Sequence, residues 1–113
     1  MNVNQKIENA LSGIVGGDIW PMKCPYDSPP DTYIVHNPEY EEPGYHADDE
    51  DQAWIHYMQV HLFTKGNYLN LRGKIRSALR DAGFILTRIE PMYEKDTGYN
   101  HLCFECWIEE DDE

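Results

Sequence analysis

The stretch Ala53-Trp-Ile-His-Tyr-Met-Gln-Val-His-Leu-Phe-Thr64 decides the fold, because it gives the strongest strand signal in this 113-residue chain. Side chains alternate between the two faces of a strand. One face would carry Trp54, Met58, Val60 and Leu62. The other face would carry Ile55, Tyr57, Gln59, His61 and Phe63. We expect the first face to meet the core, and the second to be partly exposed or covered by a neighbour.

Two helices and three further strands are predicted around this stretch. Apolar residues recur at spacings of three and four in residues 2–14 and 68–82, which indicates amphipathic helices. A short strand is predicted at 32–36, and a closing hairpin at 84–94 and 100–109. The order is then α-β-β-α-β-β. Short connections favour an α+β fold, with a mainly antiparallel sheet and both helices packed on one face.

The net charge of −12 is confined to two short segments. An acidic loop is expected at about 38–52, after Pro38 ends the preceding strand, and an acidic tail at 109–113. All other acidic residues are balanced by the nine Lys and Arg residues. The chain 1–113 is therefore predicted to be a single, nearly neutral domain with two acidic appendages. The acidic residues of the loop are Glu39, Glu41, Glu42, Asp48, Asp49, Glu50 and Asp51.

Composition excludes several classes of protein. A hydrophobic content of 41%, with eight Tyr, three Trp and three Phe, argues against disorder. No apolar run reaches the roughly 18 residues of a membrane span, and the N-terminus lacks the apolar region of a signal peptide, so the cytoplasm is the default. An acidic balance also disfavours specific nucleic-acid binding, which needs clustered Lys and Arg.

Catalytic and metal chemistry are poorly supported. Cys103 and Cys106 match a C-x-x-C pattern, but inside a strand these positions point to opposite faces, so we expect two packed thiols. A zinc site from Cys24, both strand cysteines and His101 fits no chelating spacing. The five histidines are scattered. We therefore expect no catalytic, cofactor or metal site. A metal-dependent or thiol enzyme is the least favoured of the three hypotheses that we consider.

Three arginines form a stripe along the second predicted helix. Arg72, Arg76 and Arg80 stand four residues apart and therefore share one face. A solvated helix face explains them simply. The alternative is a docking strip for the acidic arm or tail of a neighbouring subunit, since guanidinium groups suit repeated carboxylate contacts.

Three stretches together resemble a known class of protein. They are Pro30-Asp-Thr-Tyr-Ile-Val-His36, the run from Asp51 to Lys65, and Leu79-Arg-Asp-Ala-Gly-Phe84. In this order the chain resembles the tail-terminator and tail-completion proteins of bacteriophages and prophages, which are small head-to-tail joining, minor capsid-like proteins. The matching positions are packing and turn positions, and the 38–52 segment and the tail depart from the family pattern.

The resemblance implies a structural virion protein without catalytic residues. Such a protein forms a six-membered ring, a hexamer, at the head-proximal end of the tail tube, and subunits of this kind can assemble only on the tail itself. It ends tube polymerisation and contacts the tail-tube protein and the neck or connector proteins. DNA passes through it without specific binding, and no membrane is involved. The protein would be found in the host cytoplasm during assembly and then in the tail and neck of the virion.

On this hypothesis the sequence offers two groups of candidate site residues. Subunit-interface candidates are Arg72, Arg76, Arg80, Ile55, Tyr57 and Phe63. The seven acidic residues of the loop are candidates for an arm or a channel lining, because carboxylates that face the channel would repel phosphate. The alternative function is a small acidic DNA mimic, or another protein-inhibitor binding module.

Overall fold

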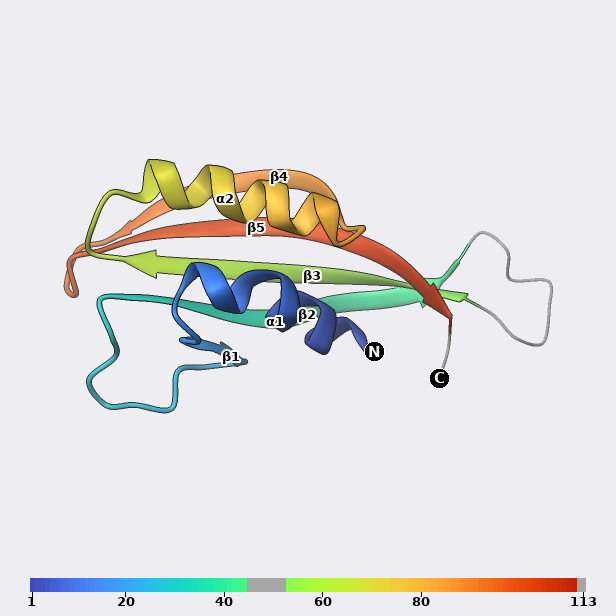
Figure 1. Ribbon diagram of the computed structural model, residues 1–113, viewed down its shortest axis with the longest axis horizontal. Helices are drawn as coiled ribbons and strands as arrows, with labels where there is room; N and C mark the ends of the chain where they lie inside the picture. Colours follow the sequence, from blue (N-terminus) through green and yellow to red (C-terminus); the bar gives the residue numbers. More distant parts are fainter. Residues whose placement is uncertain (45–52, 112–113) are drawn as a thin grey trace.

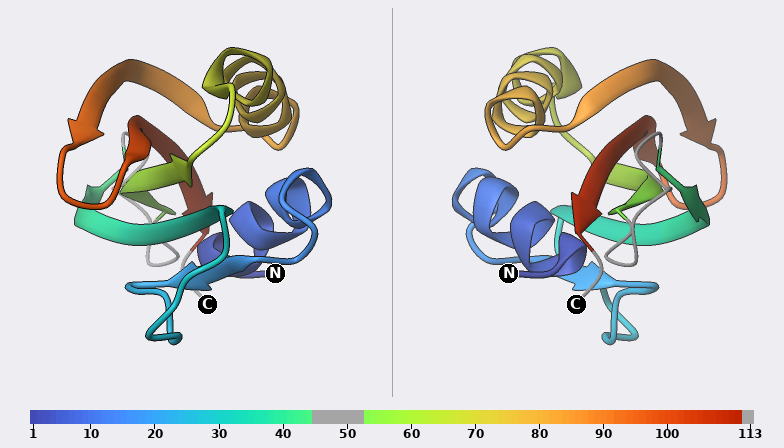
Figure 2. Two further views of the ribbon diagram at one scale, coloured as in Figure 1. Left: turned by 90° about the vertical axis from the view of Figure 1, so that its left-hand side faces the viewer. Right: turned by 90° about the vertical axis from the view of Figure 1, so that its right-hand side faces the viewer.

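A five-stranded sheet forms one layer of the molecule, and two helices cover one of its faces (Figures 1 and 2). The computed structural model describes residues 1–44 and 53–111. The elements in chain order are α1 (Val3–Leu11), the 3-10 turn η1 (Ser12–Ile14), β1 (Ile19–Pro21), β2 (Thr32–Pro43), β3 (Ala53–Thr64), α2 (Tyr68–Asp81), β4 (Ile85–Glu94) and β5 (Tyr99–Asp111).

The strands lie in the order β1-β2-β3-β5-β4. All neighbours are antiparallel except β1 and β2, which run parallel. The predicted α+β class and the predicted helix–strands–helix–strands order are confirmed, and β1 is added to that order. Within the described ranges, neither helix has the length and apolar character needed to cross a bilayer.

Capping groups define the ends of both helices. The Asn2 side chain accepts from the backbone N–H of Gln5, whose own side chain accepts from the Asn2 N–H, so two free donors at the start of α1 are satisfied. At the start of α2, the Asn67 side chain accepts a hydrogen bond from the backbone N–H of Leu69. After α2, Gly83 adopts a φ of 99°, a conformation that suits glycine, and the helix stops where the sequence predicts.

The core lies between the helices and one sheet face. Met58, Val60 and Leu62 of β3 project into it, as the alternation predicts, and meet Ile75 and Leu79 of α2. Residues three to four apart along α1 fill the rest of this layer. Trp54, predicted for the same face, is only half-buried and stands outside the core.

The predicted end of the second strand at Pro38 is wrong. β2 continues to Pro43, and a register shift between Pro38 and Tyr40 absorbs the proline. β1 pairs with β2 only as far as His36, so from Pro38 onward one side of β2 has no strand beside it. A proline there removes no ladder hydrogen bond, because that side is an edge.

Residues 18–31 contain β1 and a proline-rich segment that packs on the body of the domain. Trp20 lies 5.5 Å from Tyr26 and 6.1 Å from Tyr33, measured between ring centroids. The Tyr99 hydroxyl donates to the carbonyl of Pro30 at 2.7 Å. These contacts fix the proline-rich segment against one end of the sheet.

The closing hairpin also follows its prediction. The turn between β4 and β5 uses Gly98 at a φ of 77°. Pro91 lies in β4, which is an edge strand, where a proline is tolerated.

Candidate functional site

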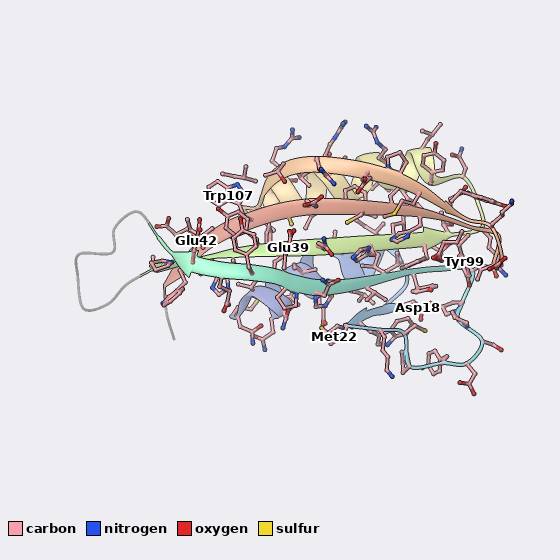
Figure 3. The ribbon with its side chains drawn as sticks, turned by 180° about the vertical axis from the view of Figure 1, so that it is seen from behind. Asp18, Met22, Glu39, Glu42, Tyr99 and Trp107 are labelled. Atoms are coloured by element: carbon pink, nitrogen blue, oxygen red, sulfur yellow. The ribbon has the colours of Figure 1, made fainter. Side chains whose placement is uncertain are left out.

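The sheet face that the helices leave uncovered is the candidate functional surface, here called the open face. Figure 3 looks onto it, with the helices behind the sheet. Strand register arranges its side chains in rows. One row is formed by Tyr40, Tyr57, Trp107 and Ile85, and another by Tyr33, Phe63, His101 and Met92. Aromatic rows thus lie near the two ends of the face, with polar residues between them.

The first row forms an exposed aromatic surface. The Tyr40 and Tyr57 rings stack at 4.2 Å between centroids, and Trp107 lies 6.4 Å from Tyr57. Tyr40 is 51% exposed, although large aromatic side chains are usually well buried. The Tyr57 hydroxyl donates to a Glu42 carboxylate oxygen at 2.8 Å. This hydrogen bond raises the pKa of Tyr57, because it favours the protonated phenol.

Carboxylates surround these rings. Glu39 lies on the open face of β2 (Figure 3), and after burial, which is the main cause, the charges of Glu105, Glu90 and Glu39 raise the pKa of the Cys103 thiol further. Arg88 is the one cation that contacts them within the described part of the chain, with its Nε 2.6 Å from Glu105 and its Nη2 3.1 Å from Glu90. The surface therefore combines exposed rings with an excess of negative charge. We call it the acidic aromatic patch, which comprises Tyr40, Tyr57, Trp107, Glu39, Glu42 and Glu105.

The structure divides the predicted acidic loop. Glu39, Glu41 and Glu42 lie on β2, which corrects the loop expected from residue 38. Glu41 lies 2.6 Å from the Nδ1 of His56. The remaining predicted acidic residues of this segment lie outside the described residues, and they are Asp48, Asp49, Glu50 and Asp51. At the other predicted appendage β5 extends to Asp111, and Glu110 forms an ion pair with Lys6.

The interface candidates of β3 differ in accessibility. Tyr57 and Phe63 are half-buried on the open face, where they remain partly accessible. Ile55 is only 2% exposed and offers almost no surface to a partner. Tyr40 and Trp107 are accessible neighbours that were not singled out. The sequence could have identified Trp107, because it alternates with the core residues of the last strand and so belongs to the opposite face. Tyr40 could not be identified, because it fell within the predicted loop.

A histidine pair occupies the other end of the open face. His61 Nδ1 and His101 Nε2 are 2.8 Å apart, and Phe63 stacks on His101 at 4.2 Å between ring centroids. Burial lowers the pKa of both histidines, and the charge of His101 lowers that of His61 further. The pair lines a shallow hollow of about 330 Å³ beside Cys24. These two histidines are 40 positions apart in the sequence and therefore looked unrelated there. Only the pairing of β3 with β5 brings them together.

The cysteines behave as packed thiols. Cys103 is on the open face and Cys106 is in the core, so the two thiols point apart as the strand pattern predicts. Burial raises the pKa of Cys103 to about 11 and that of Cys106 to about 12, which leaves both unreactive near neutral pH. Among residues 1–44 and 53–111, no group of three or more His, Cys, Asp or Glu side chains is arranged to hold a metal ion.

The predicted arginine stripe lies on the helical side of the molecule. Arg76 and Arg80 are exposed and Arg72 is half-buried. None of the three forms an ion pair with a described residue. Beside the stripe a groove of about 650 Å³ runs along α2 to Ile14 of η1. We call it the helix groove, and its lining includes Ile14, Leu69, Gly73, Lys74, Arg76 and Ala78.

Comparison with known proteins gives a match in structure and none in sequence. No protein-family model matches the chain, and no curated protein matches it. Among solved structures, it is similar to a chain of the virion of a native gene transfer agent (GTA) particle, with a TM-score of 0.67. The match covers 97% of this chain and 95% of that chain at 12% sequence identity. At this identity, the likeness shows a shared fold.

Proposed function

We propose that this chain is a structural protein of a phage-type virion, which forms a ring at the head-proximal end of the tail tube. There it would end tube polymerisation and join the tail to the neck proteins. The supporting observation is the structural match to a chain of a GTA virion, which extends over nearly the full length of both chains. The sequence resemblance to tail-terminator and tail-completion proteins points the same way.

A ring requires that one surface of each subunit meet a different surface of the next. The arginine stripe and the half-buried Tyr57 and Phe63 are the proposed interface residues, and their positions on opposite sides of the sheet suit such contacts. Ile55 contributes through packing inside its own chain, because it is buried. Carboxylates on the channel side would repel the phosphates of passing DNA.

The alternative of an acidic DNA mimic gains no support from the described acids. Such a mimic spreads carboxylates over its folded surface at phosphate-like spacing, whereas the net charge of this chain is confined to two short segments.

The test adds purified protein to polymerising tail-tube subunits of the same particle and images the products by electron microscopy. We expect a ring on one end of each tube and a narrower distribution of tube lengths. Arg76→Glu should weaken capping, whereas Lys95→Glu, in the exposed turn after β4, is the matched charge-reversal control. Tubes that grow without bound protein at any concentration would contradict the proposal.

A further inference from the structure

Two surfaces of opposite character lie on opposite sides of this chain. The acidic aromatic patch presents rings and carboxylates at one end of the open face, where Glu42 and Trp107 lie together, far from Tyr99 (Figure 3). The helix groove is lined by residues of α2 and η1. Figure 2 shows α2 on the other side of the sheet. The lining of the groove mixes apolar residues with the polar Asn70 and Ser77, the cations Lys74 and Arg76, and the acidic Asp81.

We propose that the acidic aromatic patch of one copy receives the α2 surface around the helix groove of a second copy. This inference rests on the proposed ring, and it names the two surfaces that meet. Guanidinium groups bind carboxylates through charge-assisted hydrogen bonds and also stack on aromatic faces. The patch offers both kinds of partner, and Arg76 and Arg80 have no ion pair within the described part of their own chain.

The groove can also accept a side chain. A Cβ added at Gly73 would meet no atom within 4 Å, so the surface over this residue is open. Tyr40 is the most exposed of the three rings in the patch, at 51% exposure. A ring over Gly73 and Leu69, which lies one turn before it, would have Arg76 nearby and would combine apolar contact with charge pairing.

Geometry determines the kind of assembly that results. The two surfaces lie on opposite faces of one chain and cannot meet within it. A two-fold dimer would need the patch of each copy to meet the groove of the other at the same time, which two surfaces on opposite faces of one chain do not allow. Contact between patch and groove is therefore head-to-tail, and its repetition gives either a closed ring or an open filament.

The test places the photo-crosslinker p-benzoyl-phenylalanine at Tyr40, in a mixture of isotopically light and heavy protein. Irradiation should join this position to peptides of residues 68–81 from the other isotopic form. The control carries the same crosslinker at Tyr93, which is 65% exposed on edge strand β4. Absence of light–heavy cross-links from Tyr40 to α2, in concentrated protein and on capped tubes, would overturn the inference.

A groove-filling variant gives a second readout. Gly73→Trp should lower the yield of the Tyr40 cross-link by about tenfold, the loss that hot-spot changes typically cause. Gly73→Ala adds only a methyl group and should leave the yield unchanged, and circular dichroism would verify that both variants fold. An undiminished yield with Gly73→Trp would also overturn the inference. The cross-link is also measured in concentrated protein without tubes. Failure of the protein to cap tubes would therefore contradict the proposed function and leave the cross-link result to decide the inference.

Discussion

Replacing Gly73 by alanine should stabilise this protein. Gly73 lies in the interior of the 14-residue helix α2, where glycine costs about 0.8–1.0 kcal/mol relative to alanine. The added methyl group meets no atom within 4 Å, so no clash offsets the gain. The free energy of unfolding should therefore rise by roughly 0.8–1 kcal/mol, which for a domain of this size corresponds to about 4 °C in Tm.

Urea denaturation followed by circular dichroism measures this change, with an expected increase of roughly 0.5 M in the midpoint. Gly98→Ala is the matched control, because a Cβ at Gly98 also meets nothing within 4 Å. Gly98 has a φ of 77°, however, where a Cβ costs about 1–2 kcal/mol. The two variants should shift the midpoint in opposite directions. A lowered or unchanged midpoint for Gly73→Ala would refute the reasoning from helix propensity and open space.

Three other measurements test the described packing. Phe104→Ala, at a side chain with 0% exposure, should lower the free energy of unfolding by about 3–5 kcal/mol in the same assay. In native protein, a thiol reagent at pH 8 should modify half-buried Cys24 first, and Cys103 and Cys106 only after denaturant is added; rapid reaction of all three would contradict the burial. The pKa values of His61 and His101 are lowered in the folded protein, so below about pH 6.5 the unfolded chain binds protons at these histidines more readily than the folded chain does. The free energy of unfolding should therefore fall as the pH drops below about 6.5, and His101→Gln should reduce that fall.

Much of this fold could be predicted from local pattern. The strand Ala53–Thr64 has the predicted bounds, because twelve residues of β-forming character with clear breaks on both sides leave little choice. The helix Tyr68–Asp81 is likewise defined by its apolar spacing and by Gly83. β1 could not be predicted, since three residues carry no periodicity and this strand depends on its parallel pairing with β2.

The candidate surface was harder to predict than the fold. Alternation along β3 identified Tyr57 and Phe63, but a strand pattern does not tell which side chains stand beside them. Tyr40 joins Tyr57 only because β2 continues past Pro38, and the proline signal argued against that extension. The histidine pair likewise depends on β3 and β5 being neighbours, which is a property of sheet order.

The short strand β1 has a consequence for how copies of this chain can associate. Exposed strand edges invite further strands to add, which leads to aggregation when chains are crowded. β1 covers part of the β2 edge, and the chain then turns away at Met22, whose φ of 70° takes it out of the strand path. The opposite edge, β4, carries Pro91 and the charged pair Arg88 and Glu90. Both edges thus discourage growth by strand addition, so crowded copies are steered toward contacts between faces, which can close on themselves.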